Sequence, residues 1–350
     1  MNEPITRRSR WTVRVAPAIG LYFLAPLVAE FLMGNVPITH LYALLALAPL
    51  YGGGALLIRE IARRTGRGWP TMLTWALAYG MFEEALVTQT LWNPNWGNTR
   101  ILDYGFVPEL GTAPPWMMFM VGVHTVFSIS VPIAIVETLA GPRRTTPWLG
   151  KVGLGVTTAL FVVIVGFSIF GTIWAIGNFA SAPQLVGAGV VIVVIVALGW
   201  RFGRPAPLAG ARPQAAGNAP SPWFVGGFAL VAGATFVLLY ATDPRGLSPW
   251  LAAAIPIPAW LSVVIYLALF AVVLTLMARW SHRAGWSDAH RLALAGGALL
   301  TYAWHSFPWQ SIAPASPAVD LAGNTLFTAG AVALLVVTAL RLRRDGRSYE

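Results

Sequence analysis

Four ionisable side chains stand inside stretches of sequence that are otherwise apolar. Glu83 and Glu84 are adjacent in AYGMFEEALVTQTLW, residues 78–92, while His124 lies in GVHTVFS and His305 in AWHSFPW. A charged acid at the centre of a membrane-spanning helix costs about 2.5–3.5 kcal/mol on insertion scales. Such residues usually face the interior of a helix bundle and mark a site. We therefore predict that these four residues form one polar site and carry its chemistry.

The predicted depths of these residues agree with a shared site. Glu84 lies eight residues before Trp92, His124 eight residues after Trp116 and His305 seven residues before Ile312, near the predicted outer ends of their spans. At the helical rise of about 1.5 Å per residue, they lie about 12, 12 and 10 Å below the outer surface. Adjacent glutamates point about 100° apart on a helix, and Glu84 falls on one stripe with Gly80 and Thr88. Three helices thus carry ionisable groups at one level in the outer half of the bilayer.

Several chemistries suit these residue types, of which we expect an intramembrane hydrolase first, with a proton-coupled transporter or ligand-binding membrane protein as the alternative. In an intramembrane hydrolase, a glutamate would activate a water as general base, and a histidine would orient that water or stabilise an oxyanion. In a proton-coupled transporter or ligand-binding membrane protein, the same residues would form a proton relay. Two histidines with one or two glutamates would also suit zinc, and a structural hydrogen-bonded cluster is a fourth alternative. The absence of cysteine excludes thiolate metal sites and cysteine nucleophiles.

The sequence resembles the CAAX-protease and bacteriocin-processing family of glutamic intramembrane proteases. Members of that family carry a Glu-Glu pair followed by three residues and an Arg, with Phe-x-x-x-His and His-x-x-x-Asn or Asp on later spans. The acidic pair and the two histidines match, while Thr88 stands at the Arg position, Met120 at the Phe position and Trp309 at the Asn or Asp position. The resemblance implies that the matching residues are the catalytic residues of a peptidase-like hydrolase that acts on a membrane peptide.

The elements that must position these residues are membrane-spanning helices. Of the 350 residues, 57% are hydrophobic and 10% are charged, whereas a soluble domain carries about 25% charged residues. A span needs about 20 mostly apolar residues. We predict an all-α, polytopic bundle of about ten helices at residues 15–33, 38–58, 70–92, 115–138, 152–175, 183–200, 222–241, 258–279, 291–312 and 322–341.

The basic residues predict the orientation of this bundle. With a cytoplasmic N-terminus, 21 of the 23 Lys and Arg residues fall in inner segments, and only Arg100 and Arg245 fall in outer ones. This bias follows the positive-inside rule, so we expect both termini in the cytoplasm of a bacterial plasma membrane. The net charge of +10 is spread over short inner segments without interleaved aromatic residues, which favours membrane lipids and a small molecule as partners over nucleic acid.

The segment RFGRPAPLAGARPQAAGNAPSP, residues 201–222, divides the chain. Its Pro, Ala and Gly content is typical of a linker, and we predict a six-span bundle at 1–200, which carries the acidic pair, and a four-span bundle at 223–350. Two other acids are expected near the membrane surfaces. Glu60 should form a solvated i,i+4 pair with Arg64, and Glu30 should reach the lipid headgroups.

Overall fold

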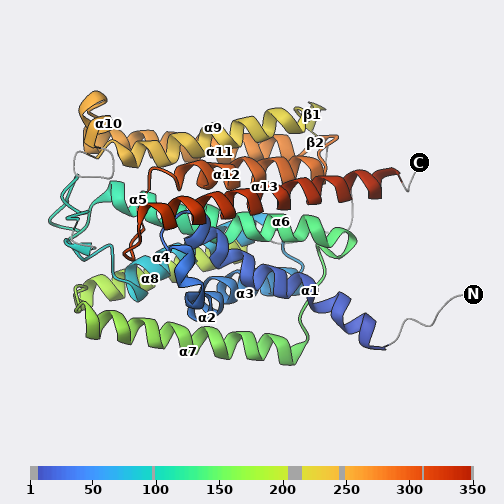
Figure 1. Ribbon diagram of the computed structural model, residues 1–350, viewed down its shortest axis with the longest axis horizontal. Helices are drawn as coiled ribbons and strands as arrows, with labels where there is room; N and C mark the ends of the chain where they lie inside the picture. Colours follow the sequence, from blue (N-terminus) through green and yellow to red (C-terminus); the bar gives the residue numbers. More distant parts are fainter. Residues whose placement is uncertain (1–6, 97–98, 204–214, 244–248, 310, 348–350) are drawn as a thin grey trace, which may run out of the picture.

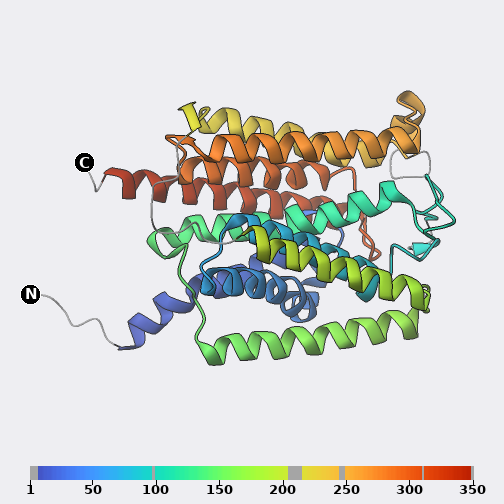
Figure 2. The ribbon, with the colours of Figure 1, turned by 180° about the vertical axis from the view of Figure 1, so that it is seen from behind.

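A computed structural model describes residues 7–96, 99–203, 215–243, 249–309 and 311–347. The chain folds into a bundle of long helices that run roughly along one axis (Figures 1 and 2). Eight helical segments of the described chain are long and apolar enough to cross a membrane, which confirms an all-α polytopic membrane protein. These segments are Val15–Leu32, Ile38–Arg64, Pro114–Arg143, Lys151–Ala175, Ala182–Phe202, Pro222–Ala241, Ala259–Ser281 and Pro317–Arg344.

The N-terminal half alternates regular helices with tighter or wider turns. Its elements are α1 (Arg7–Pro26), η1 (Leu27–Leu32), η2 (Ile38–Ala43), α2 (Leu44–Leu47), η3 (Ala48–Gly52), α3 (Gly53–Arg64), α4 (Trp69–Phe82), η4 (Glu83–Val87), α5 (Pro114–Val123), η6 (His124–Ser130), α6 (Val131–Ala140) and η7 (Gly141–Arg143). Of the short elements, η1, η3, η4 and η6 are π-helical, whereas η2 and η7 are 3₁₀ helices.

The rest of the chain forms longer and more regular helices. Its elements are α7 (Lys151–Ala175), α8 (Ala182–Phe202), β1 (Ala215–Asn218), α9 (Pro222–Ala241), α10 (Pro249–Ala254), α11 (Ala259–Ser281), β2 (Arg283–Ala284), α12 (Asp288–His305) and α13 (Pro317–Arg347). The two short strands pair in parallel, with Ala215 opposite Arg283. This pairing ties the start of α9 to the turn between α11 and α12.

Two predicted spans are not among the eight segments that qualify by length and composition. They are α4 with its continuation η4, which carries the acidic pair, and α12, which carries His305. Both helices nevertheless lie inside the bundle, because α4 packs against α8 and η6, and α12 packs against α9, α6 and α13. Polar residues lower the hydropathy of these two helices, and they include Glu83, Glu84 and His305 of the predicted site. The count of about ten spans therefore stays a prediction.

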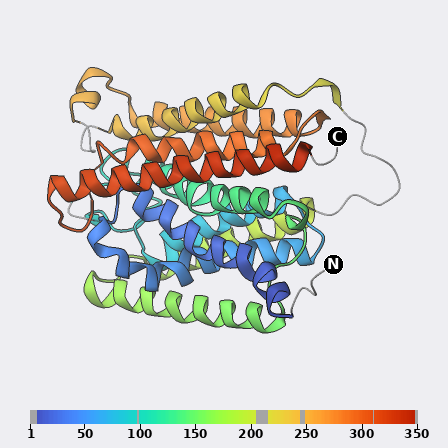
Figure 3. The same ribbon diagram turned by 45° about the vertical axis from the view of Figure 1, so that its right-hand side comes forward.

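The continuous helix α5–η6–α6 forms the centre of the bundle. In its most apolar window 78% of the residues are buried, against 6% in α7 and 11% in α8, α11 and α13. The outer helices α7 and α9 lie on opposite sides of the bundle (Figure 3). The apolar side chains exposed on the outer helices, such as Val163 and Phe167 on α7, are the surface that a bilayer covers.

Two buried clusters meet on this central helix. One joins α5, η6 and α6 to the later helices, where Phe119 stacks on Tyr240 at 4.1 Å and Phe127 stacks on Tyr302 at 4.0 Å between ring centroids. The other joins α1, α3, α4 and the same central helix. The two predicted bundles, 1–200 and 223–350, therefore share a core. Their division at 201–222 stays a prediction, since residues 204–214 of that segment lie outside the described residues.

The arginine-rich segments gather at one end of the bundle, where α1 begins and α13 ends (Figures 1 and 3). The expected i,i+4 pair of Glu60 and Arg64 forms, with 3.4 Å between Arg64 Nη2 and Glu60 Oε2. The expectation that this pair is solvated is wrong, because Glu60 is fully buried. Its carboxylate accepts hydrogen bonds from Arg59 Nη1 at 2.6 Å and from the backbone N–H of Trp148 at 2.8 Å. The segment after η7 folds back over α3 and removes this acid from water.

Candidate functional site

The described chain has four π-helical segments, and each of them supplies a polar side chain to one buried cluster. Glu30 lies in η1, Tyr51 in η3, Glu83 and Glu84 in η4, and His124 in η6. In η4 the widened turn is closed by the N–H of Thr88, which donates to the Glu83 carbonyl five residues back at 2.9 Å. Isolated π-helical turns are frequent at functional sites. We call Glu30, Tyr51, Glu83, Glu84 and His124 the acid cluster.

Glu84 and His124 form one of the two shortest contacts of the acid cluster. Their side chains are hydrogen bonded, with His124 Nε2 at 2.6 Å from Glu84 Oε1. The other ring nitrogen of His124 lies 3.2 Å from the hydroxyl of Ser128, and the other oxygen of Glu84 accepts a hydrogen bond from the hydroxyl of Thr90. Both residues are buried, with exposed fractions of 2% for Glu84 and 4% for His124. Each polar atom of this pair is therefore satisfied within the protein.

Glu83 is held more loosely. Its Oε1 accepts a hydrogen bond from the Tyr51 hydroxyl at 3.3 Å, while its Oε2 is buried without a hydrogen-bond partner and lies 3.7 Å from His124 Nδ1. The Tyr51 ring stacks on the His124 ring with 5.8 Å between centroids. Glu83 is the acid of the cluster with an open acceptor position.

Glu30 belongs to the acid cluster and not to the headgroup region, so that expectation is wrong. Its Oε1 accepts a hydrogen bond from the Tyr51 hydroxyl at 2.6 Å, and its Oε2 accepts one from the Asn35 amide at 3.2 Å. Asn35 in turn accepts a hydrogen bond from the Trp309 indole at 2.7 Å. Sequence reasoning missed Glu30 and Tyr51 because a span-end acid has an ordinary explanation and a tyrosine is not intrinsically costly in a membrane. Pro26 and Pro49, which lie beside or within η1 and η3, were the available signal of irregular helix.

His305 lies apart from the other three predicted site residues. It is buried, its Nδ1 has no hydrogen-bond partner, and its ring packs against Trp309 with 4.9 Å between centroids. No hydrogen bond or ion pair of the described residues joins it to Glu83, Glu84 or His124. The equal estimated depth of the two histidines says nothing about the direction in which each side chain points around its helix. The structure therefore brings together three of the four predicted residues.

Small residues allow the helices of the site to approach closely. A Cβ atom at Gly80 would lie 2.8 Å from the Val121 carbonyl oxygen and 3.1 Å from the Cβ of His124. One turn further along, in η4, the stripe that Gly80 and Glu84 share presents Glu84 to the His124 ring. A larger residue at position 80 would move α4 away from η6 and stretch the hydrogen bond between Glu84 and His124.

Among the described residues, no group of three or more His, Cys, Asp or Glu side chains is arranged so that it could hold a metal ion. The predicted zinc ligand set would need both histidines, and His305 is separated from the acidic pair by the packing described above. Thr88, at the position where the glutamic intramembrane proteases carry Arg, donates its hydroxyl to the Glu83 carbonyl at 3.0 Å. This side-chain hydrogen bond supports the backbone hydrogen bond from Thr88 to the same carbonyl, which closes the π-helical turn.

Comparison with known proteins places the chain in a family without assigning an activity. A family model described as an uncharacterized membrane protein family matches residues 21–344. An uncharacterized protein of Archaeoglobus fulgidus is 28% identical over 143 residues, which cover 37% of this chain and 43% of that protein. This chain therefore spans less than half the length of that relative. No solved structure matches this chain. Neither match supports the resemblance to CAAX proteases. The match over most of its length shows that the chain belongs to this uncharacterized membrane protein family.

Proposed function

We propose that this protein is a proton-coupled membrane protein, in which the acid cluster binds and releases protons as a ligand is bound or moved. The observation that carries the proposal is the joining of three carboxyl groups and one imidazole by hydrogen bonds and an ion pair in a buried site. With His124 charged and all three acids ionised, the cluster would carry a net charge of minus two. Burial of unpaired charge costs several kcal/mol per ion, so binding of protons is the low-energy way to occupy this site.

The hydrogen bonds single out Glu83 as the acid that exchanges protons. Glu84 is satisfied by His124 and Thr90, and Glu30 is satisfied by Tyr51 and Asn35. A phenol has one O–H to donate, and the Tyr51 hydroxyl lies closer to Glu30, at 2.6 Å, than to Glu83, at 3.3 Å. Glu83 thus has one weakly bound oxygen and one free oxygen. Because its neighbours are ionisable, the cluster will titrate as a coupled unit.

The surroundings of the cluster favour a change of helix conformation over a fixed pore. Beyond Tyr79, whose hydroxyl donates to the Leu50 carbonyl at 3.3 Å, the buried cluster toward the arginine-rich end is apolar and includes Met72 and Trp75 beside Ala, Leu, Ile and Val. A proton held on Glu83 would need a shift of the π-helical turns to reach that side, and interrupted helices typically form the ion and substrate sites of transporters. We propose that the cluster faces the outer side of a bacterial plasma membrane, with both termini cytoplasmic.

The proposal is tested by infrared difference spectroscopy on the purified protein in lipid nanodiscs. Spectra recorded at high and low pH should contain a protonated-carboxyl band that is lost in Glu83→Gln. Glu109→Gln removes an exposed acid and is the matched control, which should keep the band. If Glu83→Gln has the wild-type spectrum while the protein is folded, Glu83 does not bind the proton and the proposal fails.

A second function is favoured by the free Oε2 of Glu83. This oxygen is buried without a hydrogen-bond partner at 3.7 Å from a histidine nitrogen, which is a position from which a general base could activate a water. Hydrolysis can be tested without knowledge of the substrate. Membranes containing the protein are incubated in ¹⁸O-labelled water, and products that carry ¹⁸O are sought by mass spectrometry. Labelled products that disappear in Glu83→Gln would support a hydrolase, and their absence from the wild-type reaction would exclude one for the membrane components present.

A further inference from the structure

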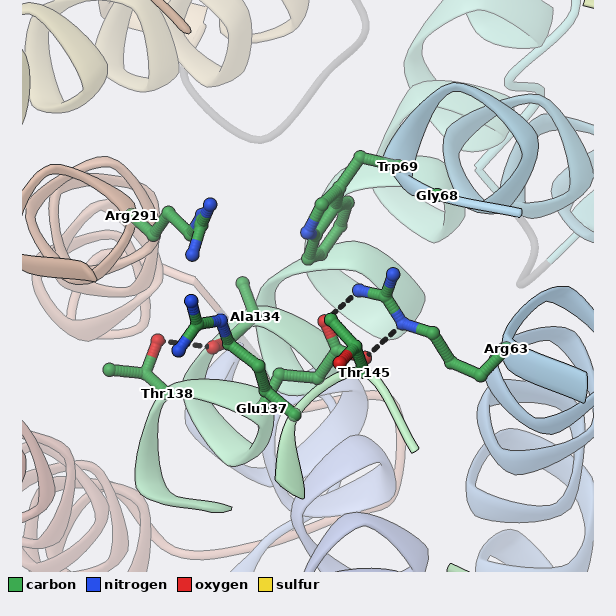
Figure 4. Close-up of a pocket in the computed structure, with 9 residues that line it drawn as sticks. Arg63, Gly68, Trp69, Ala134, Glu137, Thr138, Thr145 and Arg291 are labelled. Atoms are coloured by element: carbon green, nitrogen blue, oxygen red, sulfur yellow. Dashed lines mark hydrogen bonds and ion pairs between the residues drawn. The ribbon is translucent and has the colours of Figure 1, made fainter. Parts of the chain in front are cut away.

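A pocket of about 110 Å³ opens at the arginine-rich end of the bundle, at the opposite end of α4 from the acid cluster. Arg63 and Arg291 extend toward it from opposite sides, with the Trp69 indole between them (Figure 4). Arg144, Glu137, Thr138 and Thr145 are the other polar residues that line it. We call this site the arginine pocket, and nothing in the acid cluster depends on it.

The arginines of the pocket are only partly neutralised. Arg63 donates to both oxygens of Glu137, at 2.8 and 2.6 Å. Arg144 donates to Asp288 at 3.0 Å, and Arg291 donates to the other oxygen of the same carboxylate. Two guanidinium groups therefore share one acid, which leaves a positive charge without its own counter-ion. Asp288 and these two arginines are also the more exposed members of the group.

The next layer of charges adds to this excess. The ion pairs around the pocket join five guanidinium groups to three carboxylates, those of Arg59, Arg63, Arg64, Arg144, Arg291, Glu60, Glu137 and Asp288. In this set of described residues the guanidinium groups exceed the carboxylates by two positive charges. A phosphate group carries a matching negative charge, and its oxygens suit the paired N–H groups of arginine.

The backbone contributes in the same direction. Helix α4 begins at the pocket with Gly68 as its N-cap, which makes no side-chain cap hydrogen bond, and Pro70 in the first turn carries no N–H. The N-terminus of a helix attracts anions through its free N–H groups and the helix dipole. The pocket floor is apolar at Ala134, while Trp69 at its edge is of the type found at membrane interfaces. The excess positive charge, the N–H donors at the start of α4 and the place at the arginine-rich end of the bundle thus favour an anion at the same site.

We propose that the arginine pocket binds the phosphate group of an anionic ligand, held by Arg63, Arg144, Arg291 and the first turn of α4. The exposed fractions of the side chains, 9% for Arg63 against 36% for Arg144 and 34% for Arg291, give the site a buried floor and an accessible rim. Its place at the ends of α3 and α6 and the start of α12 puts it at the membrane surface. The phosphate can come from a phospholipid headgroup or from solution.

Two binding experiments on the full-length protein separate these sources. In the first, the protein in neutral detergent is titrated with inorganic phosphate. In the second, retention of phosphatidylglycerol over phosphatidylcholine is measured by native mass spectrometry after extraction from mixed vesicles. Saturable phosphate binding supports a soluble ligand, and selective retention of phosphatidylglycerol that phosphate does not reverse supports a lipid. Absence of both overturns the proposal.

Variants tie either result to the pocket. Arg144→Gln/Arg291→Gln should weaken binding at least about tenfold, the effect of losing one hydrogen bond to a charged group. Arg341→Gln/Arg343→Gln removes the same charge from exposed positions on α13 and should leave binding unchanged. Asp288→Asn frees both arginines and should strengthen binding, a gain that misfolding cannot produce. Equal losses in the two arginine double variants, or weaker binding in folded Asp288→Asn, would contradict the assignment.

Discussion

Replacement of Arg59 by methionine is expected to lower the free energy of unfolding by about 3–5 kcal/mol, the usual cost of removing one partner from a buried ion pair. Methionine retains much of the aliphatic volume but none of the donors. Arg59 is fully buried, and its guanidinium lies over the Trp148 ring with 3.4 Å between Cζ and the ring centroid. The loss should therefore come from electrostatics and hydrogen bonding more than from a cavity.

The magnitude follows from the contacts that would be lost. Arg59 donates to Glu60 at 2.6 Å, to Glu137 at 3.1 Å, and to the backbone carbonyls of Arg144 and Thr146 at 2.8 and 2.7 Å. Glu137 would keep Arg63, and Glu60 would keep two backbone N–H donors, so neither acid would be left bare. The two partly buried carbonyls would also lose these hydrogen bonds, and a hydrogen bond to a charged group contributes about 1.5–3 kcal/mol. The loss is thus expected within the range for one missing partner.

The assay is thermal unfolding in mild detergent, followed by tryptophan fluorescence. With about 2 °C per kcal/mol for a large chain, Arg59→Met should lower the midpoint by roughly 6 °C or more. Arg100→Met is the matched control, because Arg100 pairs with Asp103 while its side chain is 71% exposed, and exposed pairs contribute little. Equal midpoints for the two variants would refute the reasoning that burial of the charge network makes it stabilising.

Two further substitutions test the packing around the acid cluster. Gly52→Ala would place a Cβ 1.9 Å from the Tyr22 carbonyl oxygen, so it should lower the free energy of unfolding by about 1–3 kcal/mol by pushing α1 away from η3. Gly20→Ala is the control and should leave the thermal midpoint unchanged, because no atom lies within 4 Å of the added Cβ. Equal shifts of the midpoint in the two variants would contradict this packing. Asn35→Ala should lower the free energy of unfolding by about 1–3 kcal/mol, because the partly buried Glu30 and Trp309 side chains would each lose a hydrogen bond. In a double-mutant cycle with Trp309→Phe the two losses should be non-additive. Additive losses would argue against the 2.7 Å hydrogen bond between Asn35 and Trp309.

The amino-acid sequence alone determined the class of this protein and much of its site. An apolar content of 57% with 10% charge requires a bilayer around the helices, and the spacing of apolar runs located the helices well. Insertion energetics identified Glu83, Glu84 and His124 as residues that need buried partners. The sequence also placed Gly80 and Glu84 on one helical stripe, since that depends only on positions along one helix.

Tertiary structure decided which side chains face one another. Depth follows from counting residues, but the direction of a side chain around its helix depends on packing, and for that reason His305 lies apart while Glu30 and Tyr51 join the site. Pro26 and Pro49 indicated irregular helix near η1 and η3, but η4 contains no proline, so its widened turn was not evident from the sequence. The same holds at the other end of the bundle, where Glu60 was expected in water. Only the fold of the segment around Trp148 over α3 buries it beside Arg59, because burial is a property of the assembled chain.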